Sequence, residues 1–74
     1  MKVKLGRYRH YKGGEYEVLG VAIHSETLEE MVIYKMLYDS DDFKKGTIWV
    51  RPMKIWMEEV EFEERMMKRF EFVK

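Results

Sequence analysis

Residues 7–24, RYRHYKGGEYEVLGVAIH, decide the fold, because they join an alternating segment, a tight turn and a long apolar segment. Charged and aromatic side chains alternate up to the turn, as expected for a strand. The Gly13-Gly14 pair is a strong hairpin signal. Residues 16–24 are apolar and β-branched on both faces, and the Gly20 in their middle indicates a bulge or bend. A long strand bent at Gly20 can serve two sheets at once, which predicts a small barrel.

The next segment, residues 29–38 (EEMVIYKMLY), fits two conformations. Thr27 and Glu30 match the capping-box pattern that starts a helix. A helix, however, would place apolar groups nearly all round its surface. The β-branched and aromatic residues favour a strand, with Val32, Tyr34 and Met36 on one face. We therefore expect a strand.

The remaining segments are shorter. Residues 39–46 (DSDDFKKG) form a solvated loop, and residues 47–51 (TIWVR) a short strand that ends at Pro52, which cannot donate to a sheet ladder. A single turn of helix after Pro52 and a C-terminal hairpin follow. The expected architecture is all-β, a small barrel of about five to six short strands. The side chains expected in its core are Leu19, Val21, Ile23, Ile48 and Val50.

Size and composition exclude several classes of protein. The chain has 74 residues, which make one small domain spanning 1–74. It has no Cys, so neither a disulfide framework nor a thiolate metal site supports it. No apolar run approaches the ~20 residues that cross a bilayer, and no signal peptide is evident, so we expect a cytoplasmic protein without membrane partners. Phosphate-loop and dinucleotide fingerprints are absent, and no cofactor is expected.

The charge is balanced overall but divided along the chain. There are 14 Lys+Arg and 14 Asp+Glu; residues 1–14 contain no acid and residues 15–30 no Lys or Arg. One interpretation is a basic patch for phosphates. The other, which we favour, is that neighbouring strands of opposite charge pair across the hairpin. A dedicated nucleic-acid binder usually has a clear basic excess.

Candidate chemistry around the histidines is weak. His10, His24 and Glu26 supply three metal-ligand side chains, but their spacing matches no metal signature. We expect residue 10 to pair with residue 17 across the turn, so the two histidines would not be neighbours. Ser25 beside His24 lacks a nucleophile elbow, so no catalytic residue is assigned. For His24 and Glu26 we favour ligand contact, and for Ser25 and Thr27 a structural role in the turn.

Aromatic and basic side chains form the most suggestive set. Trp49 and Arg51 point away from the face of Ile48 and Val50, and Trp, Tyr and Arg are enriched in binding hot spots. An alternative of about equal weight is that bulky aromatics simply fill a small core. We expect a surface that also includes the segment after His24 as its rim. The candidate ligand-binding residues are Arg9, Tyr11, His24, Glu26, Trp49 and Arg51.

Three motifs occur in a specific order: RHYKGG, HSETLE and WVRP. With their flanking segments, from about Gly6 to Glu59, they resemble the domain-of-unknown-function family 1653, a family of small bacterial proteins. The resemblance implies a fold similar to SH3-type barrels and no established activity. The end of the chain departs from the pattern, because residues 63–70 read EERMMKRF where family members tend to have a Gly-containing turn and PRF.

The sequence therefore predicts a small, SH3-like, non-enzymatic binding module. The expected partner is a peptide segment of another protein, bound by the aromatic and basic surface. A second hypothesis is a nucleic-acid-binding barrel. A third is a small enzyme or metal protein centred on His10, His24 and Glu26.

Overall fold

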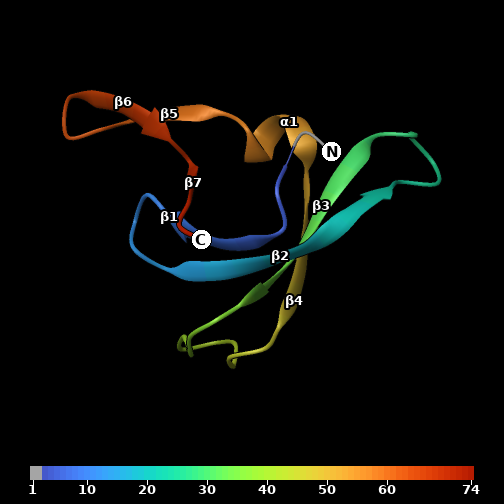
Figure 1. The fold of residues 1–74 in the computed structure, drawn as a ribbon, viewed down its shortest axis with the longest axis horizontal. Coiled ribbons are helices and arrows are strands. Elements are labelled where there is room, and N and C mark those ends of the chain that lie inside the picture. The colour runs from blue at the N-terminus through green and yellow to red at the C-terminus, as the bar shows by residue number, and fades with distance from the viewer. Residues whose placement is uncertain (1–2) are drawn as a thin grey trace.

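The computed structural model describes residues 3–74, and these form antiparallel strands with one short helix (Figure 1). A five-stranded sheet has the order β4-β3-β2-β1-β7, and β5 and β6 form a separate hairpin. The elements are β1 (Gly6–His10), β2 (Glu15–Ile23), β3 (Glu30–Met36), β4 (Ile48–Pro52), α1 (Met53–Trp56), β5 (Glu59–Phe62), β6 (Arg65–Lys68) and β7 (Phe70–Phe72).

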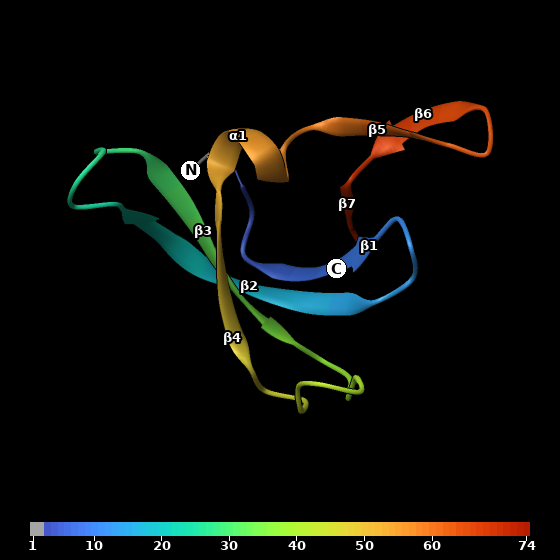
Figure 2. The same ribbon diagram turned by 180° about the vertical axis from the view of Figure 1, so that it is seen from behind.

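This architecture confirms the all-β prediction, including the strand within 29–38, the helical turn after Pro52 and the C-terminal hairpin. The described residues form seven strands rather than five or six, because the chain returns after β6 and adds β7 to the main sheet. The barrel is not closed, since β4 and β7 are the two edges of that sheet. Figures 1 and 2 show α1 lying across the hollow side of the bent sheet from β1 and β2.

The first hairpin is tighter than expected. Arg9 pairs with Glu15 and Tyr8 with Tyr16, so residue 10 does not oppose residue 17 as predicted. The reason is the short turn, in which Gly13 adopts a φ of +113° and its N–H donates to the carbonyl of His10 (2.7 Å). The bulge expected near Gly20 is present, as a register shift between Val18 and Gly20.

The core is aromatic and lies on the hollow side of the sheet. Trp56 of α1 stacks on Phe70 of β7 with ring centroids 3.8 Å apart, and Tyr8 and Tyr34 pack around this pair. The buried hydrophobic side chains of the described residues are Val3, Tyr8, Val18, Val32, Tyr34, Met36, Met53, Trp56 and Phe70.

The predicted core was mostly wrong. Leu19, Ile23, Ile48 and Val50 are exposed by 40%, 58%, 62% and 55%, and Val21 is half-buried. Both faces of these strands are apolar, so alternation alone did not reveal which face turns inward. The inward face is the one with the larger aromatic side chains, because α1 supplies Trp56 as their packing partner.

Within residues 3–74, no helix has the length and apolar character needed to span a membrane.

Candidate functional site

A cleft on the inward face of β4 contains the side chains of Trp49 and Arg51. Its volume is about 240 Å³. Strands β2, β3 and β4 supply one wall and the loop after β3 supplies the other, and we call it the Arg51 cleft. Its lining residues are Tyr16, Tyr34, Met36, Tyr38, Ser40, Phe43, Trp49 and Arg51.

Among the residues that the structure describes, Arg51 is the only cation that lines the cleft, and its side chain is held in place by an aromatic ring. Its guanidinium carbon lies 5.2 Å from the centroid of Phe70, a distance typical of cation–π contacts. Among residues 3–74, no side chain forms an ion pair or hydrogen bond with Arg51. The donors of the guanidinium are therefore oriented but available.

Two tyrosines meet in the cleft, Tyr16 from the strand wall and Tyr38 from the loop wall. The hydroxyls of Tyr16 and Tyr38 are 2.7 Å apart, so one donates to the other. Tyr38 reaches this position because Gly14 has no side chain, since a Cβ there would lie 2.7 Å from the Tyr38 hydroxyl oxygen. Burial raises the pKa of Tyr16, and the hydrogen bond with Tyr38 raises it further, so the Tyr16 hydroxyl is uncharged at neutral pH.

The neighbourhood of the cleft is electropositive. Burial lowers the pKa of His10, and the positive charges of Arg51, Arg69 and Lys12 lower it further. His10 Nδ1 accepts a hydrogen bond from the backbone N–H of Lys12 (3.2 Å). Arg69 is neutralised by Glu58, with 2.6 Å between Nη2 and Oε1. Arg51 has no such partner within the described chain, so the positive charge of the cleft is not cancelled locally.

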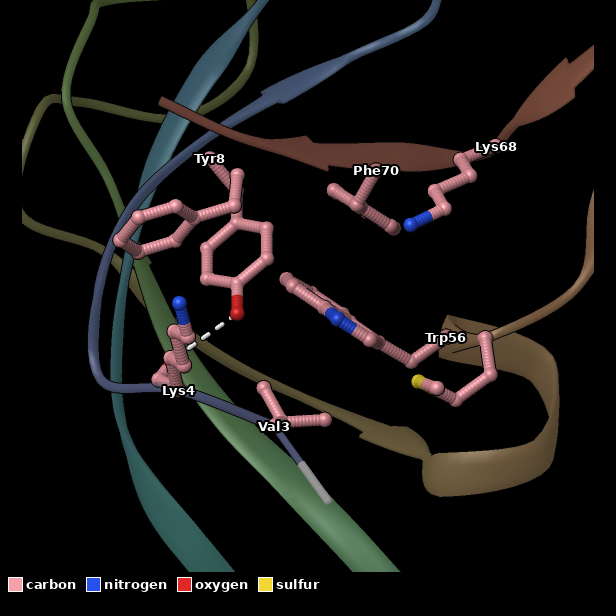
Figure 3. A pocket seen from close by; sticks show the side chains of 8 residues that line it. Val3, Lys4, Tyr8, Trp56, Lys68 and Phe70 are labelled. Carbon is pink, nitrogen blue, oxygen red and sulfur yellow. Dashed lines mark hydrogen bonds between the residues drawn. The ribbon is translucent and has the colours of Figure 1, made fainter. Parts of the chain in front are cut away.

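A second pocket lies against α1, on the other side of the core (Figure 3). Its volume is about 270 Å³, and we call it the Trp56 pocket. Four of the side chains that line it are aromatic, and two lysines from distant parts of the chain lie at its margins. The lining residues are Val3, Lys4, Tyr8, Trp56, Met57, Lys68, Phe70 and Phe72.

The structure brings together only part of the predicted site. Trp49 and Arg51 share the Arg51 cleft. Arg9 lies in β1 and pairs with Glu15, with 3.1 Å between Nη2 and Oε2. Tyr11 lies in the turn after β1, in edge contact with Phe62 at 5.4 Å between centroids. Neither Arg9 nor Tyr11 lines the Arg51 cleft.

His24 and Glu26 lie in the turn between β2 and β3. Nδ1 of His24 accepts hydrogen bonds from the backbone N–H groups of Glu26 (3.1 Å) and Thr27 (3.4 Å), and Oγ1 of Thr27 accepts one from Glu29 (3.2 Å). His24 therefore organises the turn. Ligand contact by His24 and Glu26 stays a prediction.

The two histidines lie at opposite ends of β2. His10 precedes this nine-residue strand and His24 follows it, a separation of roughly 30 Å at about 3.3 Å per residue. In the part of the chain that the structure describes, no three His, Asp or Glu side chains group as metal ligands would. The hypothesis of one centre built from His10, His24 and Glu26 therefore does not agree with the fold.

Sequence reasoning missed Phe70 as the platform for Arg51. The two residues are 19 positions apart, and β7 lies in the C-terminal segment whose pattern fitted both helix and strand. The one available signal was the alternation of Phe70 and Phe72, which identified a strand but not its neighbour.

Comparison with known proteins gives a consistent result. The family model described as "Protein of unknown function (DUF1653)" matches residues 6–72. The chain belongs to this family. The crystal structure of a DUF1653 protein from Bordetella bronchiseptica is similar, with 37% sequence identity, a TM-score of 0.85, and coverage of 96% of this chain and 87% of that one. A search of curated proteins gave no match.

Membership of DUF1653 confirms the resemblance inferred from the three motifs. The match to residue 72 also includes the C-terminal segment that departs from the expected PRF pattern. In this DUF1653 protein the departing residues 63–70 cover the turn and second strand of the β5–β6 hairpin and end at Phe70, the first residue of β7.

Proposed function

We propose that this protein is a non-enzymatic, cytoplasmic binding module that recognises an extended peptide segment of a partner protein in the Arg51 cleft. Arg51 would bind an acidic side chain of the peptide, and Trp49 would contact the apolar residue beside it. The observation that supports this most is the guanidinium of Arg51, which rests on Phe70 without an anionic partner among residues 3–74. Such a group favours a carboxylate, which it can bind through two parallel hydrogen bonds.

The position of β4 supports an extended peptide in particular. β4 is an edge strand, so one of its sides has no neighbouring strand in the sheet. A peptide that pairs with an exposed edge gains main-chain hydrogen bonds, and its alternate side chains face the same way as those of the strand. Here Trp49 and Arg51 are the inward side chains next to that edge.

Nucleic acid is the less favoured partner. The basic segment that suggested a phosphate patch is neutralised in part, because Arg7 and Arg9 both approach the one carboxylate of Glu15, at 3.8 and 3.1 Å. A phosphate-binding surface would also give an affinity that falls by about 0.9 log unit per log unit of salt for each duplex contact. We expect no duplex binding in a gel-shift assay at physiological salt.

Panning a random peptide library displayed on phage against the full chain tests the proposal. We expect enriched peptides with Asp or Glu next to an apolar or aromatic residue. Arg51→Gln should weaken their binding at least tenfold. Trp49→Ala should reduce the free energy of peptide binding by about 2 kcal/mol or more. Lys54→Gln is the matched control, since Lys54 is an exposed cation on α1 outside the cleft.

Two results would contradict the proposal. Enriched peptides without any acidic residue would show that Arg51 does not bind an acidic side chain of the peptide. Binding that is equal in wild type and Arg51→Gln, with both folded by circular dichroism, would place the peptide elsewhere.

A further inference from the structure

The Trp56 pocket combines aromatic walls with hydrogen-bond donors for which residues 3–74 supply no acceptor. Trp56 is only 2% exposed, yet no residue in 3–74 accepts a hydrogen bond from its indole Nε1–H. The pocket that Trp56 lines is therefore where an acceptor from a ligand would be favourable.

Two ammonium groups add positive charge to the same pocket. Nζ of Lys4 lies 5.0 Å from the centroid of Phe72, and Lys68 approaches from β6. Figure 3 shows the two amino groups on opposite sides of the pocket, with Tyr8 and Trp56 between them. Within residues 3–74 neither lysine forms an ion pair, and the lining residues include no carboxylate.

The walls of the pocket are aromatic rings that pack on one another. Trp56 stacks on Phe70, and Tyr8 meets both Trp56 and Phe72 edge to face, at 5.4 and 5.3 Å. A cavity of roughly 150 Å³ already accepts benzene. The 270 Å³ of this pocket is room for a bicyclic ring.

We propose that the Trp56 pocket is a binding site for a small aromatic carboxylate, distinct from the Arg51 cleft. The ring of the ligand would pack against Tyr8, Phe72 and the indole of Trp56. Its carboxylate would accept hydrogen bonds from the indole N–H and from the ammonium groups of Lys4 and Lys68. A monoanion fits such an apolar pocket better than a dianion, because it costs less to remove from water.

The indole N–H signals provide a direct assay. The chain has two tryptophans, so a ¹H–¹⁵N spectrum of the full chain should contain one indole signal from the Trp56 pocket and one from the Arg51 cleft. The probe is indole-3-carboxylate at up to millimolar concentration. We expect it to shift the Trp56 indole signal and to leave that of Trp49 in place. Neutral indole-3-carboxamide, acetate and inorganic phosphate should cause at most a tenth of that shift at equal concentration.

Variants separate this site from the proposed peptide cleft. The double variant Lys4→Gln with Lys68→Gln should raise the dissociation constant of indole-3-carboxylate at least tenfold and keep the native spectrum, because Lys4 and Lys68 are exposed. Arg51→Gln, which tests the peptide cleft, should leave this dissociation constant unchanged. The two proposals can therefore fail independently.

Several outcomes would overturn the inference. One is the absence of a Trp56 shift at millimolar indole-3-carboxylate. Another is equal binding of the neutral carboxamide, or a phosphate shift as large as that of the probe. A third is loss of binding in Arg51→Gln but not in the double lysine variant.

Discussion

Gly6 begins β1 with a φ of +132°, and a Cβ atom there would lie 2.7 Å from the carbonyl oxygen of Lys74. That oxygen accepts a hydrogen bond from the N–H of Arg7 at 2.8 Å, so it is not free to move. We expect Gly6→Ala to lower the free energy of unfolding by about 1–3 kcal/mol, as is typical of backbone strain. Urea denaturation followed by circular dichroism measures this change.

Gly20→Ala is the matched control for Gly6→Ala. A Cβ at Gly20 would meet no heavy atom within 4 Å, and its φ is not in the left-handed region. The Gly20→Ala variant should be as stable as the wild type or slightly more stable, because alanine restricts the conformations of the unfolded chain. Equal stability of Gly6→Ala and Gly20→Ala would contradict the close approach of the C-terminal residue to β1.

His10 reports on the charge around the Arg51 cleft. Its pKa is lowered from 6.5, first by burial and then by Arg51. We expect Arg51→Gln to raise the pKa of His10 and Lys54→Gln to leave it unchanged, in an NMR titration of the imidazole protons. A wild-type His10 pKa at or above 6.5 would show that the ring is not buried beside these cations.

The same pKa shift makes stability depend on pH. The folded protein binds the His10 proton less tightly than the unfolded chain does. The contribution of His10 to stability is therefore full above pH 6.5 and is lost as the pH falls through the lowered folded value. In His10→Gln this part of the loss of stability on acidification should be absent.

At the scale of elements, the four-residue helix α1 supplies the Trp56 side chain that completes the aromatic core. It is too short to be stable alone, and its place depends on the buried side chains of Met53 and Trp56. Trp56→Ala should cost about 3–5 kcal/mol, typical of a large aromatic removed from a core. Such a loss approaches the whole free energy of unfolding of a small domain. The midpoint temperature of thermal unfolding should therefore fall steeply, or the cooperative transition should vanish.

Lys54→Ala provides the control within α1. The Lys54 side chain is 79% exposed, and its ion pair with Glu29 spans 3.6 Å. Exposed pairs of this kind contribute about 0–1 kcal/mol, so its thermal transition should lie close to that of the wild type. If Trp56→Ala also melts close to wild type, α1 does not hold the aromatic core together.

On the scale of the whole molecule, the β5–β6 hairpin stands apart from the main sheet. It forms its own two-stranded sheet, and most of its side chains are exposed. Its contacts with the rest include Phe62 against Tyr11 and the Glu58–Arg69 ion pair at its base. We expect its amides to exchange with solvent faster than those of β2 and β3, since regions with little buried surface open at lower free energy.

Hydrogen exchange measured by NMR decides between one cooperative unit and two. Val18 and Val32 lie at the centre of the main sheet and are fully buried, so their amides should be among the slowest to exchange. Phe62→Ala should accelerate exchange in β5 and β6 without affecting those central amides. Uniform protection across both sheets would mean that the hairpin unfolds only with the whole domain.

Local signals in the sequence were sufficient to identify the elements. The Gly-Gly turn, the bulge near Gly20, the strand within 29–38 and the break at Pro52 are all present, because each depends on residues close together in the chain. The opposed directions of Trp49 and Val50 also followed from alternation, since successive side chains of a strand point to opposite faces. The family resemblance depended on the same local motifs.

Only the tertiary structure decided which face became the core and which residues share a site. Val50 and Trp49 are both apolar enough to be buried, so the choice depended on Trp56, which packs on the inward face from an element later in the chain. The contact of Arg51 with Phe70 likewise arises because β7 returns to pair with β1. Alternation defines two faces of a strand, but long-range packing determines which of them is inside.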